Sequence, residues 1–114
     1  MKNFAEYWIE SFESNRIIKL NKRYVTLNDL EPIFEGLSSE VTMTEIGKSF
    51  ENRPLKMLSL GTGTKAVIAW SCMHGNETTA LRGWMDWLVF QENTENKQRF
   101  GELLNEFTIH FIPM

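Results

Sequence analysis

The stretch AVIAWSCMHGNETT, residues 66–79, decides how this chain is expected to fold. It opens with a continuous apolar run, which is typical of a short β-strand covered on both faces. Apolar residues at helical spacing then predict a helix over about residues 77–90. A second apolar run at residues 108–112 predicts another strand, and the long helical connection between the two strands favours parallel pairing with a right-handed crossover.

Before this stretch, the apolar residues change from helical spacing to strand-like alternation. A short amphipathic helix is predicted over residues 3–13. A second helix is expected over about residues 27–37, because a threonine and an aspartate at its start resemble a capping pair. A half-buried strand at residues 41–46 and a further strand at residues 55–60 follow, and the short connections favour antiparallel pairing.

The remaining segments complete the expected layout. Gly61 and Gly63 predict a turn, because glycine adopts positive φ without steric cost. Residues 91–98 are polar and predict a loop, and residues 100–107 predict a short helix. The expected fold class is therefore α/β, with a mixed β-sheet flanked by helices.

A chain of 114 residues has the length of one small domain. We expect a helical lead-in at residues 1–40 and a region holding the sheet and its polar motif at residues 41–114. Because the sequence stops directly after an apolar strand, we expect residues 1–114 to be the N-terminal segment of a longer catalytic domain.

Composition excludes several classes of protein. The chain is 42% hydrophobic and 24% charged, which argues against intrinsic disorder, and its formal charge of −3 argues against binding nucleic acid. A single cysteine, Cys72, excludes an intrachain disulfide. No apolar stretch is long enough to predict a membrane span, and acidic residues interrupt the N-terminus, so we expect a cytoplasmic protein without a membrane partner.

The most informative polar residues are His74 and Glu77, which follow the predicted buried strand. If the next helix begins near them, an imidazole and a carboxylate three residues apart converge on one point, and both are suitable ligands for Zn²⁺. Gly75 between them allows a tight turn. A simpler interpretation remains open: Glu77 places negative charge at a helix N-terminus, and His74 is a hydrogen-bonded loop residue.

Other candidate residues favour structural roles. Cys72 lacks the pattern of a catalytic nucleophile and is expected to behave as a small apolar residue. Arg53 is expected to form a structural salt bridge rather than to bind substrate. His110, considered as a third metal ligand, is more consistent with a satisfied structural histidine.

Three landmarks resemble the zinc carboxypeptidases, the carboxypeptidase A-like metallopeptidases. The segment IGKSFENRPL, residues 46–55, is similar to that family's G-x-S-x-E-G-R-P sequence. HGNE, residues 74–77, matches its His-x-x-Glu zinc motif, and IHFIPM, residues 109–114, looks like the strand before its Asn-Pro-Asp-Gly segment. The resemblance covers residues 41–114 and implies part of the zinc carboxypeptidase fold.

The resemblance also implies a chemistry. Zinc would be held by His74, Glu77 and a later histidine, and the full-length protein would hydrolyse C-terminal peptide bonds with metal-activated water. The family's third ligand, its general-base glutamate and its carboxylate-binding arginine would lie beyond Met114, so no catalytic residue is assigned here and the isolated chain is expected to be inactive.

Two further functions stay open. Asn76 stands where the best-known digestive members carry arginine, and the His-Gly-Asn-Glu variant also resembles the aspartoacylase and desuccinylase branch. That branch implies a zinc-dependent deacylase acting on N-acyl amino acids. The other alternative is a non-catalytic folding or interaction module that associates with itself through an unfinished sheet edge.

Overall fold

The computed structural model describes residues 3–114, so the first two residues of the predicted lead-in lie outside the described residues. The elements in chain order are α1 (Phe4–Asn15), a short 3-10 helix η1 (Ile18–Leu20), α2 (Leu27–Glu35), β1 (Thr42–Lys48), β2 (Pro54–Leu60), β3 (Lys65–Trp70), α3 (Thr79–Phe90), α4 (Thr94–Glu106) and β4 (Phe107–Ile112). Within residues 3–114, no helix combines the length and the apolar character needed to cross a membrane.

The four strands form one mixed sheet in the order β1-β2-β4-β3. β1 pairs antiparallel with β2, β2 pairs antiparallel with β4, and β3 pairs parallel with β4. The α/β class with a mixed sheet and the parallel return strand are therefore confirmed. The expectation that β2 and β3 would pair directly is wrong, because β4 lies between them.

The connection between β2 and β3 crosses the start of β4 at very short range. The Thr62 N–H donates to the carbonyl of Leu104 at 2.8 Å, and the Thr108 hydroxyl donates to the carbonyl of Gly63 at 2.7 Å. Gly61 has φ of 104°, and a Cβ on Gly63 would lie 1.9 Å from the backbone of Glu106. The two glycines thus make a tight crossover rather than the expected hairpin turn.

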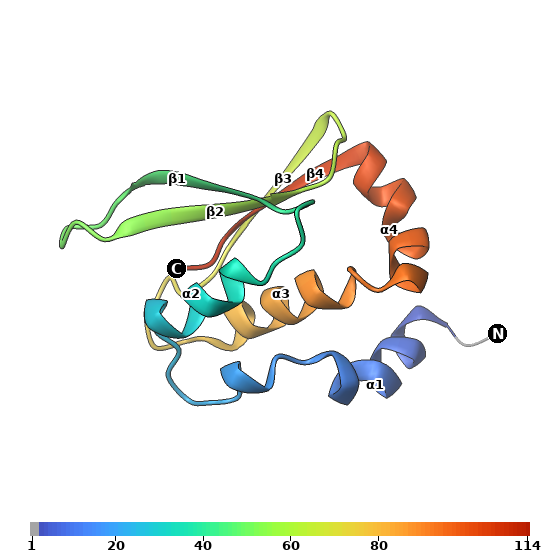
Figure 1. The fold of residues 1–114 in the computed structure, drawn as a ribbon, viewed down its shortest axis with the longest axis horizontal. Coiled ribbons are helices and arrows are strands. Elements are labelled where there is room, and N and C mark those ends of the chain that lie inside the picture. The colour runs from blue at the N-terminus through green and yellow to red at the C-terminus, as the bar shows by residue number, and fades with distance from the viewer. Residues whose placement is uncertain (1–2) are drawn as a thin grey trace.

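The core lies between the sheet and helices α2 and α3, which Figure 1 shows on the same side of it. Trp84 of α3 stacks on Phe111 of β4, with ring centroids 5.2 Å apart. The most deeply buried core side chains come from both layers: Leu20, Leu30, Leu58, Leu81, Met85 and Phe111.

The two outer strands are more exposed than their sequences predict. β3 is an edge strand, and Val67, Ile68 and Trp70 on it are all exposed. Every residue of β1 except Gly47 is exposed as well. The expectations of a strand covered on both faces and of a half-buried strand are therefore wrong for the described residues, since no helix or loop among them covers these positions.

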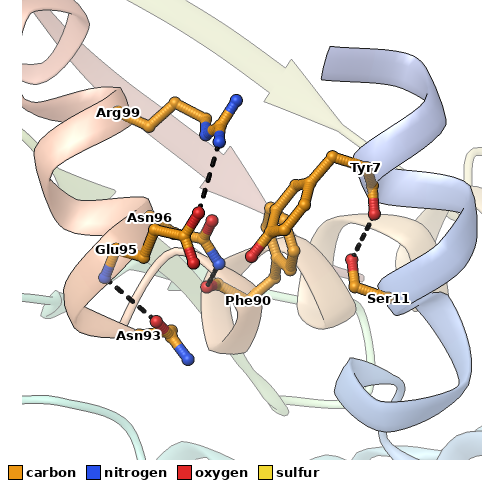
Figure 2. A network of polar contacts seen from close by, with 7 residues as sticks. All are labelled: Tyr7, Ser11, Phe90, Asn93, Glu95, Asn96 and Arg99. Atoms are coloured by element: carbon orange, nitrogen blue, oxygen red, sulfur yellow. Dashed lines mark hydrogen bonds and ion pairs between the residues drawn. The ribbon is translucent and has the colours of Figure 1, made fainter. Parts of the chain in front are cut away.

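Helix α4 begins inside the segment predicted as a loop, residues 91–98, and the reason lies in two asparagines (Figure 2). The side chain of Asn93 caps the helix by accepting a hydrogen bond from the Glu95 N–H at 3.0 Å. The side chain of Asn96 is buried and donates to the carbonyl of Phe90 at 2.8 Å. A buried amide with a backbone partner stabilises this corner although its sequence is polar.

Helix α1 packs against the same corner through aromatic rings. The ring centroids of Trp8 and Phe90 are 4.5 Å apart. The Arg99 guanidinium lies 4.7 Å from the centroid of the Tyr7 ring, and both residues are drawn in Figure 2. A cation over an aromatic face is attracted by the ring quadrupole. The lead-in helix therefore joins the α3–α4 corner rather than the sheet.

The crossover predicts a strong effect of one methyl group. We expect Gly63→Ala to lower the free energy of unfolding by more than about 2 kcal/mol, because the new Cβ would overlap the Glu106 backbone. Gly83→Ala in helix α3 is the control, because a Cβ there meets no neighbouring atom within 4 Å outside its own helix backbone. This substitution should raise the free energy of unfolding by about 0.5–1 kcal/mol, because alanine favours the helix more than glycine does. Urea denaturation measures both; equal effects would contradict the crossover.

Candidate metal site after strand β3

The loop from β3 to α3, residues 71–78, is fixed at both ends. At its start, the Ser71 hydroxyl donates to the carbonyl of Pro113 at 2.6 Å, just after β4. At its end, the buried Thr78 hydroxyl donates to the carbonyl of Arg23 at 3.3 Å. These two contacts hold the loop at the carboxyl ends of the parallel strands, where open α/β sheets commonly bind ligands.

The chain reverses after β3 at Cys72, which has φ of 54° in the left-handed region. Gly75, expected to allow a tight turn after His74, lies inside the turn that the Glu77 N–H closes on the His74 carbonyl, and it does so without a positive φ. Cys72 packs against the core, and burial raises the pKa of its thiol, which keeps it protonated. This environment agrees with the small apolar role inferred from the sequence.

The side chains of His74 and Glu77 face each other across this loop. Nδ1 of His74 lies 3.0 Å from Oε2 of Glu77, within hydrogen-bond distance, and both side chains are 70% exposed. The Glu77 N–H also donates to the carbonyl of His74 at 2.9 Å, which closes a tight turn. Helix α3 begins two residues later, at Thr79, rather than at Glu77.

The donor atoms of this pair suit one zinc ion. Tetrahedral zinc with bonds of about 2.0–2.2 Å to nitrogen and oxygen separates two ligand atoms by roughly 3.4 Å. The observed 3.0 Å between Nδ1 and Oε2 is close to this value, and exposed side chains can rotate by the small remainder. Among residues 3–114 there is no group of three or more His, Cys, Asp or Glu side chains placed to hold a metal ion. His74 and Glu77 would be two of the four ligands of such an ion, in place of the hydrogen bond that they make with each other.

The other candidate residues have ordinary partners or open surroundings. Nδ1 of His110 lies 2.8 Å from the Ser59 hydroxyl on the neighbouring strand β2, and it does not join His74. Arg53 forms an ion pair with Glu51 at the surface. Asn76 is exposed.

A cavity of ≈ 780 Å³ lies beside the loop, and no pattern in the sequence predicted it. Gly75 and Met114 line one side, and Arg53 lies on the connection between β1 and β2. The start of α2 forms another wall, from Thr26 to Asn28. These segments are far apart in the sequence, so no local pattern could have predicted that they enclose one space.

The start of α2 is fixed by a charged capping group. The Asp29 carboxylate accepts hydrogen bonds from the Thr26 N–H at 2.7 Å and from its hydroxyl at 2.9 Å, and it also pairs with Lys22. The hydrogen bond from Lys22, followed by those from Thr26, lowers the pKa of Asp29 from 3.8 to about 2. The capping pair predicted from the sequence is therefore confirmed.

A family model described as zinc carboxypeptidase matches residues 28–114. This chain belongs to the zinc carboxypeptidase family. The match begins at residue 28, within the predicted lead-in, whereas the sequence landmarks begin only at residue 46. No curated protein matches the chain by sequence.

Solved structures of carboxypeptidases share the fold of this family member. The metallo-carboxypeptidase from Burkholderia cenocepacia has a TM-score of 0.63 at 19% identity, and the match covers 79% of this chain and 27% of that one. The metallo-carboxypeptidase from Pseudomonas aeruginosa, in complex with (2-guanidinoethylmercapto)succinic acid, has a TM-score of 0.63 at 15% identity. This match covers 79% of this chain and 25% of that one. Carboxypeptidase A from Helicoverpa armigera has a TM-score of 0.58 at 18% identity. This match covers 96% of this chain and 31% of that one. This chain therefore spans about a quarter to a third of their lengths.

The Asp29 cap predicts a pH-dependent stability. Because its folded pKa lies below its unfolded value, the cap stabilises the fold above pH 3.8, and this stabilisation is lost as the pH falls through about 2. We expect Asp29→Asn to lower the melting temperature at pH 7 and to make little difference below pH 2, where the carboxyl group is protonated in both the folded and the unfolded state. Glu102→Gln, which removes an exposed carboxylate from α4, is the charge control. Equal effects of the two substitutions at pH 7 would contradict this role of Asp29.

Proposed function

We propose that this chain is the N-terminal part of a zinc metallocarboxypeptidase that hydrolyses C-terminal peptide bonds. The observation that carries the proposal is the 3.0 Å separation of the His74 and Glu77 donor atoms in a chain of the zinc carboxypeptidase family. The fit of these atoms to one zinc ion supports it. The proposed substrate is a peptide with a free C-terminal carboxylate, and the proposed location is the cytoplasm.

In this proposal His74 and Glu77 hold zinc through Nδ1 and a carboxylate oxygen. When bound, zinc polarises a carbonyl group and lowers the pKa of a coordinated water toward neutrality. The anchors at Ser71 and Thr78 fix the loop, so that neither ligand has to be ordered from a mobile segment. Anchoring in advance reduces the entropy lost when a ligand binds.

The third ligand, the general base and the carboxylate-binding arginine are not proposed among residues 1–114. Residues 1–40 are proposed as a lead-in and residues 41–114 as the part of the catalytic domain that carries the zinc motif. The proposed catalytic unit is the longer protein, and the chain by itself is proposed to be inactive. Two ligands without a general base cannot supply both activation of water and proton transfer.

Zinc binding by the chain tests the two ligands directly. We expect calorimetry to detect weak zinc binding, and His74→Ala to weaken it by at least about 10-fold, because a donor is lost. His110→Ala, at the only other histidine, is the matched control and should bind zinc like the parent chain. Loss of binding in His110→Ala alone, or no zinc binding by the parent, would contradict the assignment.

Activity of the complete gene product tests the reaction. We expect it to release C-terminal residues from peptides when loaded with zinc, and Glu77→Gln to reduce both its zinc content and its turnover. Release of acyl groups from N-acyl amino acids instead would favour the deacylase alternative. A zinc-loaded product that cleaves neither substrate would favour the non-catalytic module.

A further inference from the structure

The start of helix α3 is held by a segment that lies far away in the sequence. Thr78 is the N-cap residue of α3, a position where a threonine hydroxyl ordinarily accepts a hydrogen bond from the first turn of its own helix. Its hydroxyl makes no such bond and donates instead to the carbonyl of Arg23 at 3.3 Å. The side chain is 3% exposed, so this contact lies inside the protein. A local preference given up for a distant partner is typical of a position under functional constraint.

The segment that supplies this carbonyl, residues 17–23, is attached to α3 at its other end as well. The Ile17 N–H donates to the Asp86 carboxylate at 2.7 Å. Asp86 lies eight residues after Thr78, a little over two helical turns, so both contacts are on the same side of α3. Between them Leu20 is 1% exposed and belongs to the hydrophobic core. We call residues 17–23 the brace; Figure 1 draws it in blue below α3.

We propose that Thr78 is a positioning residue for the two zinc ligands and that the brace holds it in place. This inference rests on the proposed function, because it takes His74 and Glu77 as the ligands. The match to the family model begins at residue 28, so the brace lies outside the matched residues and the inference gives part of the lead-in a role. Both contacts of the brace are buried or partly buried contacts between described residues, and neither depends on an exposed surface.

A short covalent and hydrogen-bonded path leads from the brace to the ligands. Thr78 follows Glu77 directly, so fixing its hydroxyl restrains the backbone that carries the Glu77 carboxylate. The Glu77 N–H in turn donates to the carbonyl of His74 at 2.9 Å. The backbone turn thus places Nδ1 of His74 and Oε2 of Glu77 3.0 Å apart.

The exposure of the two ligands makes this restraint on the backbone important. Both side chains are 70% exposed, so packing against neighbours contributes little to holding them in position. If the bond from Thr78 to Arg23 is lost, the backbone at Glu77 gains freedom that zinc binding must remove again. Ordering a loop on binding lowers affinity. The loss therefore appears as weaker zinc binding while both donor atoms are still present.

The zinc affinity of the complete gene product, measured by competition with a chromogenic chelator, tests this role. Thr78→Val removes the hydroxyl but keeps the branched shape, and we expect it to weaken zinc binding by about 10-fold, as loss of an outer-shell contact does. Thr78→Ser retains the hydroxyl and should bind zinc like the parent. Thr79→Val makes the same change at the next residue, which is exposed, and should also leave the affinity unchanged.

A second control separates positioning from a general loss of stability. Asn96→Ala removes a buried hydrogen bond to the Phe90 carbonyl, at the opposite end of α3. Urea denaturation of the zinc-free proteins should show that both Asn96→Ala and Thr78→Val are less stable than the parent. Only Thr78→Val should bind zinc more weakly, with circular dichroism confirming that each variant is folded under the conditions of the titration.

The outcomes distinguish this inference from the proposed function. Parent-like zinc affinity in Thr78→Val, or equal weakening in Asn96→Ala, overturns the positioning role and leaves His74 and Glu77 as ligands. A parent protein that binds no zinc overturns the proposed function and this inference with it. If Thr78→Val does not fold, Asp86→Ala releases the other end of the brace and should also weaken zinc binding; an unchanged affinity in that variant overturns the inference.

Discussion

The parallel pairing of β3 with β4 is the constraint on which the rest of this structure depends. It requires the chain to cross the start of β4, and the crossing passes so close to Glu106 that Gly63 has no room for a side chain. The same pairing brings the far ends of both strands together, where Ser71 bonds to Pro113. A close backbone contact at one end of the sheet thus determines where the loop with His74 begins at the other end.

The candidate site combines a local and a distant contribution. The three-residue spacing and the tight turn bring His74 and Glu77 together, and both features lie within a few residues of sequence. The direction of the loop depends instead on Thr78, which bonds to a carbonyl more than fifty residues earlier in the chain. This division explains why the motif could be found in the sequence whereas the cavity beside it could not.

The apolar composition of strand β3 did not predict its position in the sheet. Its apolar run is the kind found in strands covered on both faces, yet Ile68 and Trp70 are exposed at a sheet edge. Composition reports how well a strand tolerates being covered, but it does not say which residues cover it. In β1, too, the alternation identified a strand correctly, although the predicted half-burial is absent.

The sequence by itself determined the types of the elements, the parallel return strand, the capping of α2 by Asp29 and the family, because each depends on spacing or on short motifs. Only the tertiary structure decided the strand order, the start of α4 and the cavity next to Gly75. Those features depend on contacts between residues far apart in the chain, such as Asn96 with the end of α3. Local propensity carries no information about such partners, so packing alone selects among the arrangements that the sequence pattern allows.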